Sequence, residues 1–308
     1  MSSKLEQLKK MTLVVADTGD LDALRRYQPT DATTNPSLLL QALALPDYQP
    51  LAQQARQLAK EQQINPYDTF AALLAAQVQE LVPGYVSIEV DARTSFDRQA
   101  SLERSKQLVR LVKEAGGDSE RLLIKLAATW EGIQAAQELE QAGIRCNLTL
   151  VFGFAQARAC ADAGVTLISP FVGRILDWHQ AKEPTADFSG HADPGVQSVQ
   201  KIFRYYKERG YPTIVMGASF RNQGEIEALA GCDRLTISPT LLNQLEEDTA
   251  PLEQQLHANL PAQPKDKPLT EAEFRLELNA DAMATEKLAE GIRRFIDDLE
   301  KLETQIQA

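Results

Sequence analysis

Short runs of β-branched and aliphatic residues recur along the chain, separated by longer segments whose apolar residues lie three and four apart. This alternation is typical of parallel β/α units. Eight strands are predicted: Leu13–Asp17, Asp31–Asn35, Tyr85–Asp91, Arg121–Ala127, Arg145–Val151, Thr166–Phe171, Thr213–Ala218 and Arg234–Ser238. Helical spacing covers ranges that include Tyr48–Glu80, Phe96–Ala115, Glu131–Ala142, Phe154–Ala163 and Gln197–Arg209.

The number of units distinguishes two α/β architectures. Open doubly wound sheets more often have about five or six strands, whereas eight strands fit a closed barrel. A chain of 308 residues suits one such domain. We therefore predict a single (β/α)8 TIM barrel over residues 1–308, with additional C-terminal helices from about residue 270, and keep an open sheet as the alternative.

The C-terminal part of the chain carries two signals. The Pro-rich segment Leu260–Pro268 predicts a surface loop that leads into the extension. A final helix is predicted at roughly Met283–Leu302, and it should pack on the barrel or on a second subunit. Its apolar face comprises Leu288, Ile292, Phe295, Ile296 and Leu299.

Composition and charge narrow the partners and the location. The chain has 43 acidic and 32 basic residues, a formal charge of −11, which disfavours nucleic acid and anionic membranes as partners. The first ten residues are charged and amphipathic, and the apolar stretch that follows them is too short for the core of a signal peptide or for a membrane span. We therefore expect a cytoplasmic protein. Cys146, Cys160 and Cys232 lack CxxC spacing and are expected to be reduced core residues.

Lys125 is the first candidate for chemistry. It lies within Arg121–Ala128, a run too short and aliphatic to be anything but a buried strand. Desolvation favours the neutral amine that a Schiff-base nucleophile requires. A lysine in a structural ion pair is the alternative that this strand alone leaves open.

Other strands also carry polar residues on one face when they are read with a period of two. Most of these residues lie late in their strands, and a β/α barrel carries its active site at the C-terminal strand ends. We therefore predict one catalytic mouth lined from at least five strands. The polar positions are Asp17, Ser87, Glu89, Asp91, Asn147, Thr149 and Ser169, with Phe171 beside the last.

Arg174 and Arg221 follow two late strands, at the place where barrels often bind phosphate. A phosphate clamp and two exposed arginines in ion pairs both fit this pattern. His179, His191 and His257 are the only histidines, and none has metal-ligand spacing, so we interpret them as exposed loop residues.

Seven segments in chain order resemble the signatures of bacterial-type transaldolases, over a region from about Val14 to the C-terminal helix. They are Val14–Asp20, Asp31–Ser37, Glu89–Arg93, Ile124–Ala127, Cys146–Thr149, Ile168–Ile175 and Val215–Arg221. The resemblance implies a Schiff-base enzyme of the non-oxidative pentose phosphate pathway. It would transfer a dihydroxyacetone unit between fructose 6-phosphate and erythrose 4-phosphate, giving sedoheptulose 7-phosphate and glyceraldehyde 3-phosphate. It implies small-molecule sugar phosphates as partners, no metal or organic cofactor, and a homodimer.

The same resemblance assigns roles to residues. Lys125 forms the imine, Asp17 is the general base, and Glu89 is an acid/base that acts through a water held by Thr149. By this resemblance the three-carbon unit would be held by Asn35, Asn147 and Ser169, and water would be excluded by Phe171. The phosphate would be bound by Arg174, Ser219 and Arg221.

Two alternatives stay open at this point. A plain fructose 6-phosphate aldolase would use the same lysine. By the same resemblance, however, such aldolases carry a tyrosine at the position that corresponds to Phe171 in this chain. A non-catalytic sugar-phosphate sensor would keep the arginines but would have no need of Lys125, Asp17 and Glu89 together.

Overall fold

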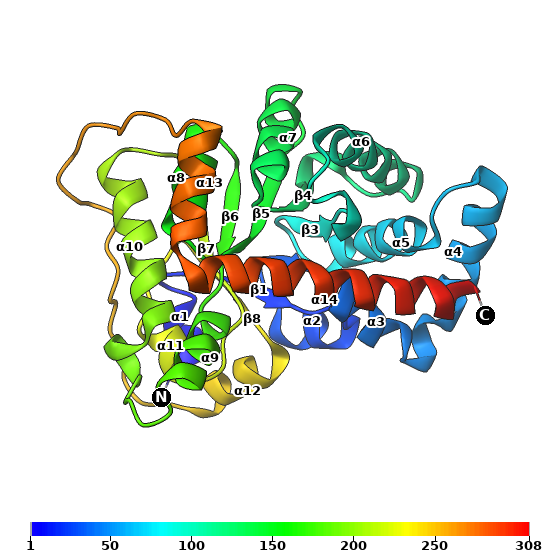
Figure 1. Ribbon diagram of the computed structural model, residues 1–308. Coiled ribbons are helices and arrows are strands. Elements are labelled where there is room, and N and C mark those ends of the chain that lie inside the picture. Colours follow the sequence, from blue (N-terminus) through cyan, green and yellow to red (C-terminus); the bar gives the residue numbers. More distant parts are fainter. Residues whose placement is uncertain (1, 308) are drawn as a thin grey trace. The chain divides into compact units, whose positions relative to one another are not determined.

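In the computed structural model, which describes residues 2–307, the strands pair in chain order as one closed barrel, from β1 to β8 (Figure 1). The predicted (β/α)8 class is confirmed, and an open sheet is excluded. The strands are β1 (Leu13–Asp17), β2 (Asp31–Thr33), β3 (Val86–Glu89), β4 (Leu122–Ala127), β5 (Cys146–Val151), β6 (Leu167–Pro170), β7 (Ile214–Gly217) and β8 (Arg234–Ile237).

All eight predicted strands are present, and most are shorter than predicted. The second ends at Thr33 rather than Asn35, because Asn35 is the N-cap of the next helix and Pro36 begins that helix. The helices are α1 (Lys4–Leu8), α2 (Leu21–Tyr27), α3 (Pro36–Leu43), α4 (Gln49–Gln62), α5 (Pro66–Leu81), α6 (Arg98–Glu114), α7 (Trp130–Gln141), α8 (Phe154–Asp162), α9 (Gly173–Lys182), α10 (Pro194–Glu208), α11 (Gln223–Glu227), α12 (Pro239–Glu247), α13 (Glu271–Ala280) and α14 (Ala282–Gln307).

The stretch Tyr48–Glu80, for which helical spacing was predicted, is helical and forms two helices, α4 and α5. Gln63, after α4, has a φ of 55° in the left-handed region, and Asn65 caps the start of α5. Pro66 cannot donate the backbone hydrogen bond that a continuous helix would need. The chain therefore reverses here, and α4 and α5 pack side by side (Figure 1).

Contacts along the chain divide it into two compact units. The first comprises residues up to Val15 together with Leu148–Ala289, and the second comprises Ala16–Asn147 together with the residues from Glu290 on. In the first unit α13 packs beside α8, and in the second α5 packs between α4 and α6 and against β3. The prediction of a single domain over the whole chain stays a prediction.

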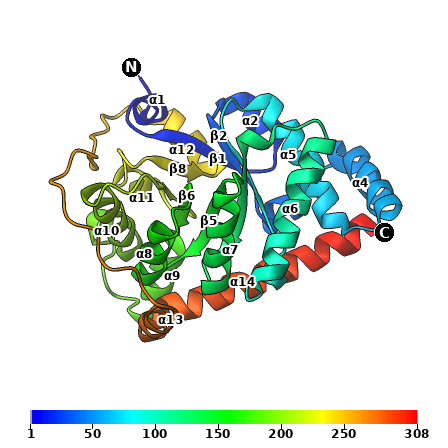
Figure 2. The ribbon, with the colours of Figure 1, turned by 90° about the horizontal axis from the view of Figure 1, so that it is seen from above.

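The C-terminal half of α14 packs within the second unit, as predicted for the final helix. Ile292, Phe295 and Leu299 are buried, and Ile296 is half-buried. Leu288, in the part of α14 that belongs to the first unit, is also buried. Polar contacts join the C-terminal half of the helix to α3, α4 and the start of α5, and Figure 2 shows its C-terminal end beside α4. The predicted loop Leu260–Pro268 is also confirmed as an exposed segment without helix or strand.

Strand β5 ends in an unusual turn. Leu150 has a φ of 55°, a left-handed conformation that costs a leucine about 1–2 kcal/mol. The buried side chain of Gln156, on α8, compensates for this strain with three hydrogen bonds. Its Nε2 donates to the Leu150 carbonyl at 3.0 Å, and its Oε1 accepts from the backbone N–H groups of Phe152 and Gly153, both at 2.9 Å.

This arrangement predicts that Gln156→Leu is strongly destabilising, although leucine has nearly the same size. The change leaves two N–H groups and one carbonyl buried without a partner, and we expect a loss of about 2–5 kcal/mol in the free energy of unfolding. Urea unfolding of the variant, against Gln53→Leu on the exposed face of α4, measures this. If the two variants lose equal stability, the turn after β5 does not need this side chain.

Candidate active site

Lys125 and Glu89 form a buried ion pair in the second unit. The two residues are register partners on the neighbouring strands β4 and β3, so their side chains leave the sheet on the same face. Lys125 is 4% exposed, its Nζ lies 3.2 Å from Glu89 Oε2, and it donates a hydrogen bond to the Thr34 carbonyl at 3.2 Å. The carboxylate is therefore placed to accept the proton that the ammonium must lose before it can act as a nucleophile.

Asp17 and Asn35 lie at the ends of β1 and β2 in the same unit. The Thr33 hydroxyl donates a hydrogen bond to Asp17 Oδ1 at 2.9 Å, which orients a half-buried carboxylate. The Asn35 side-chain oxygen accepts from the Leu38 N–H at 2.9 Å as the N-cap of α3. This fixes the amide so that only its Nδ2 group is left to donate to a ligand. Thr33 was not predicted as a site residue.

Asn147 is fully buried on β5, and its Nδ2 donates to the Ser87 hydroxyl at 3.1 Å. Ser87 belongs to the polar face of β3 that carries Glu89 two residues later. Within the second unit the structure thus brings together Lys125 with Glu89, Asp17 with Thr33, and Asn147 with Ser87. Each predicted site residue of the second unit lies within a strand or just after its C-terminal end, which is where β/α barrels carry their active sites.

In the first unit, Thr149 and Ser169 are buried polar residues on β5 and β6. The Thr149 hydroxyl oxygen has no hydrogen-bond partner among residues 2–307. Leaving a buried hydroxyl without a partner costs about 1–3 kcal/mol, so this position suits a group that binds a water or a substrate oxygen.

Phe171 and Arg174 form a second predicted cluster in this unit. Phe171 follows β6 and is buried, with its ring edge against Phe152 at 5.2 Å between centroids. The Arg174 guanidinium lies over the same ring, 4.9 Å from its centroid. A cation held over an aromatic face keeps its N–H donors in a fixed plane, which suits recognition of a phosphate.

Ser219 and Arg221 lie beside the start of α9. Ser219 has a φ of 62°, and its carbonyl accepts from the Gly173 N–H at 2.9 Å. A Cβ at Gly173 would lie 2.5 Å from Arg221 Cγ and 2.6 Å from the Ser219 carbonyl oxygen, so this close approach requires glycine. The first turn of α9 and the loop after β7 are thereby held together, and they carry Arg174 and Arg221.

The Arg221 side chain is 39% exposed and pairs with Asp177 on α9. Its Nη2 lies 2.7 Å from Asp177 Oδ2, and its Nε lies 3.1 and 3.2 Å from the two carboxylate oxygens. Of the two interpretations that the sequence left open, the exposed ion pair is therefore the one that Arg221 forms in this structure. Asp177 was not predicted as a site residue, although its position three residues after Arg174 places both at one end of the same helix.

Other chemistry has little support in the part of the chain that the structure describes. No group of three or more His, Cys, Asp or Glu side chains there could hold a metal ion, and no helix there is long and apolar enough to span a membrane. The three cysteines are free and buried, as predicted. The prediction of an exposed loop is wrong for His179, which is half-buried on α9 and packs against Trp178 and Phe188.

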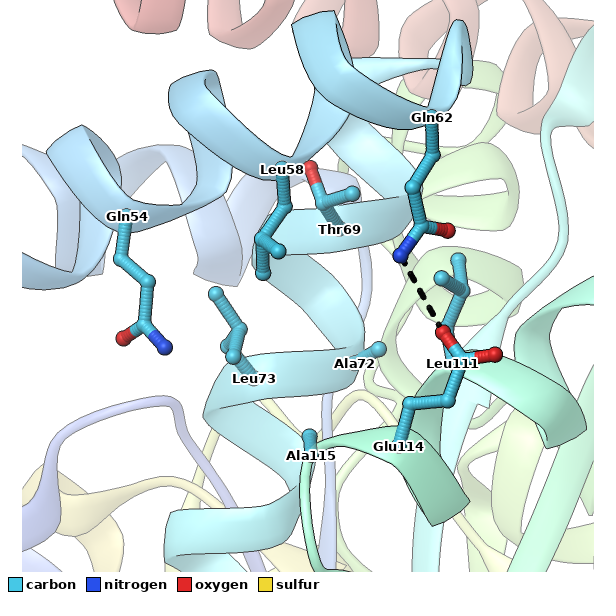
Figure 3. Close-up of a pocket in the computed structure, with 9 residues that line it drawn as sticks. All are labelled: Gln54, Leu58, Gln62, Thr69, Ala72, Leu73, Leu111, Glu114 and Ala115. Carbon is cyan, nitrogen blue, oxygen red and sulfur yellow. Dashed lines mark hydrogen bonds between the residues drawn. The ribbon is translucent and has the colours of Figure 1, made fainter.

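A cavity of about 460 Å³ lies elsewhere in the second unit, between α4, α5 and α6 (Figure 3). Its polar contact is a hydrogen bond of 3.3 Å from Gln62 to Glu114, and leucine and alanine side chains make up much of the rest. None of the predicted site residues lines it. The cavity is therefore a gap between outer helices, with Glu114 as the one titratable side chain in its lining and no lysine or cysteine nucleophile there.

The chain is similar to known proteins over its full length. The family model described as transaldolase/fructose-6-phosphate aldolase matches residues 14–306. A protein of Pasteurella multocida named transaldolase A is 56% identical over 313 residues, which cover 99% of each chain. Proteins named transaldolase from Pseudoalteromonas atlantica and Haemophilus influenzae are 56% and 55% identical over 315 residues, covering all of this chain and 99% of theirs. With these matches over its full length, the chain belongs to the transaldolase/fructose-6-phosphate aldolase family.

Proposed function

We propose that this protein is a transaldolase, which moves a dihydroxyacetone unit from fructose 6-phosphate to erythrose 4-phosphate and yields glyceraldehyde 3-phosphate and sedoheptulose 7-phosphate. The observation that carries the proposal is the buried Lys125 amine, 3.2 Å from the Glu89 carboxylate on the neighbouring strand. Relatives named transaldolase that match the whole chain support it.

The first step is imine formation. Lys125 passes its proton to Glu89, and the free amine attacks the C2 carbonyl of the ketose phosphate. The resulting carbinolamine must lose water, and Glu89 returns a proton to the departing hydroxyl. Thr149, whose buried hydroxyl has no hydrogen-bond partner in the described part of the chain, is proposed to hold the water that relays this proton.

Asp17 is proposed to act in the second step. It takes the proton of the C4 hydroxyl, the C3–C4 bond breaks, and its electron pair moves into the protonated imine. Glyceraldehyde 3-phosphate leaves, and the three-carbon unit stays on Lys125 as an enamine. The hydrogen bond from Thr33 supports this role, because it orients the carboxylate that must reach the hydroxyl.

The enamine must survive until the acceptor aldehyde arrives. Asn35, Asn147 and Ser169 are proposed to hold its hydroxyl groups, so that the carbon nucleophile keeps one orientation. The bond from Asn147 to Ser87 and the capping bond of Asn35 support this, since both fix the amide plane. The acceptor adds to the enamine, Asp17 returns the proton, and hydrolysis releases sedoheptulose 7-phosphate.

The phosphate of each sugar is assigned to Arg174, Arg221 and Ser219. Arg174 is oriented by the Phe171 ring, and Arg221 by its ion pair with Asp177. A phosphate has two negative charges near neutral pH and can share or replace the single charge of Asp177 as a partner of Arg221.

The family also contains fructose 6-phosphate aldolases, which release dihydroxyacetone instead of transferring it. Phe171 favours the transferase. Its ring lies between the Phe152 ring and the Arg174 guanidinium, and a ring without a hydroxyl cannot order a water that protonates the enamine.

A place in the non-oxidative pentose phosphate pathway, a cytoplasmic location and a homodimer are proposed on the same family resemblance. None of them is needed for the chemistry of Lys125. Fractionation of the native cells and sedimentation analysis of the purified chain test the location and the dimer separately.

The transfer assay tests the function. We expect wild type to form sedoheptulose 7-phosphate from fructose 6-phosphate and erythrose 4-phosphate, and Lys125→Ala to lose about 10⁴-fold or more of this rate, because the substitution removes the nucleophile. Lys113→Ala, on the exposed face of α6, is the matched control and should keep wild-type activity. Near-native transfer by Lys125→Ala would rule out the mechanism.

Phe171→Tyr tests what makes the enzyme a transferase. The added hydroxyl can order a water beside the enamine, so we expect dihydroxyacetone release to rise and transfer to fall. The measurement is dihydroxyacetone release from fructose 6-phosphate without an acceptor, compared with wild type. If the variant still transfers but releases no more dihydroxyacetone than wild type, the Phe171 ring does not control protonation.

A further inference from the structure

Two buried carboxyl groups lie directly behind the proposed phosphate clamp, and no step of the mechanism uses them. Glu225, on α11, is 2% exposed, and Asp193, the N-cap of α10, is 1% exposed. Glu225 Oε2 accepts a hydrogen bond from the Arg221 backbone N–H at 2.7 Å. Asp193 Oδ1 accepts from the N–H groups of Gly195 at 2.7 Å and Val196 at 3.2 Å.

The two carboxyl groups are also in hydrogen-bonding contact with each other. A carboxylate is only an acceptor, so this contact needs a proton on one of the two. Glu225 Oε1 is buried and has no donor among residues 2–307, which leaves a place for that proton. Two ionised carboxylates here would repel each other in a medium of low polarity.

The surrounding charges do not remove the need for this proton. Desolvation and the neighbouring Asp193 raise the pKa of Glu225 to about 7, although the Arg221 N–H and guanidinium act in the opposite direction. Desolvation also raises the pKa of Asp193, against its two backbone hydrogen bonds and the nearby charge of His179. The pair therefore still holds a proton as the pH approaches about 7.

This pair joins three segments that carry or support the clamp. It ties the backbone of Arg221 to the first turn of α10, and α10 in turn lies against the start of α9. A Cβ at Gly195 would lie 2.2 Å from the Val172 carbonyl oxygen, at the residue that precedes α9. Movement of Glu225 would therefore displace both Arg221 and the segment that positions Arg174.

We propose that Glu225 and Asp193 share one proton that fixes the Arg221 backbone, so that sugar-phosphate binding weakens as the pH rises past neutrality. Glu225 and Asp193 are positioning residues that act through Arg221. The inference rests on the proposed function, because it assigns the substrate phosphate to Arg221. Its physical part, the shared proton, can be measured without substrate.

Amide substitutions separate the proton from the carboxyl groups. In Glu225→Gln the side-chain oxygen still accepts from Arg221 N–H, and the new NH2 group donates permanently to Asp193. Asp193→Asn does the same from the other side, because its oxygen still accepts from Gly195 and Val196. Both variants imitate the protonated pair at every pH, and Glu253→Gln on the exposed surface of the same unit is the charge-matched control.

The first measurement is the pH dependence of KM for fructose 6-phosphate between pH 6.0 and 8.5. Over this range we expect the KM of wild type and of Glu253→Gln to rise about tenfold, which corresponds to the loss of one charge-assisted hydrogen bond to the phosphate. The KM of both amide variants should change by less than about twofold. The kcat profiles should stay alike. If Glu225→Gln and Asp193→Asn follow the wild-type KM profile, the clamp does not depend on this proton.

The second measurement is the thermal unfolding midpoint from pH 4.5 to 8.5, and it does not depend on activity. A carboxyl whose pKa is raised by folding stabilises fully below its unfolded pKa, about 4.5, and loses this contribution as the pH rises to its folded pKa. Wild type should therefore lose stability relative to Glu225→Gln between about pH 4.5 and 7, and no more above pH 7.5.

The two measurements distinguish the two ways of failing. If no transfer occurs at any pH but the unfolding difference is present, the proposed function is wrong and the shared proton stands. If the unfolding midpoints of wild type and Glu225→Gln run parallel over the whole range, the pair shares no proton and the inference is wrong.

Discussion

The ion pair of Lys125 and Glu89 is the interaction on which the proposed chemistry depends. Both groups are almost completely removed from water, and each balances the charge of the other at 3.2 Å. Buried ion pairs contribute little net stability, because desolvation offsets most of their attraction, and loss of one partner typically costs about 3–5 kcal/mol. An aliphatic residue at position 125 would avoid this desolvation cost. The presence of a lysine there is therefore better explained by a need for its amine in the reaction. The parallel register of β3 and β4 meets this need by placing the two residues opposite each other.

The proposed phosphate clamp is held by a different kind of constraint. Arg174 is oriented by an aromatic ring, Arg221 by Asp177, and their backbones by the contact of Gly173 with Ser219. Glu225 and Asp193 extend this support to α10. Catalysis at Lys125 needs one accurately placed amine, whereas phosphate binding needs several donors with a common orientation. The first requirement is met by strand register, and the second by loops and helix starts that glycine and buried carboxyl groups hold together.

Much of the fold and many of the candidate residues could be predicted because their signals are local. Aliphatic runs locate the strands to within two residues at each end, and period-two alternation identifies the polar face that carries Glu89, Asn147 and Thr149. The break between α4 and α5 was missed, although Pro66 marks it. The supporting residues could not be predicted in the same way, since Thr33, Asp177 and Glu225 act on partners between 4 and 44 positions away in the chain. The role of Gln156 could not be predicted either, because nothing in the neighbouring sequence indicates that Leu150 adopts a left-handed conformation.

Covalent trapping of the substrate on Lys125 tests the central claim most directly. The protein is reduced with borohydride in the presence of fructose 6-phosphate, digested with trypsin and mapped by mass spectrometry. A modified Lys125 is not cleaved, so the account predicts an adduct on the intact peptide Leu122–Arg145, with no adduct in the absence of sugar. An adduct on a different lysine, or complete cleavage after Lys125 with no adduct on any peptide, would contradict it.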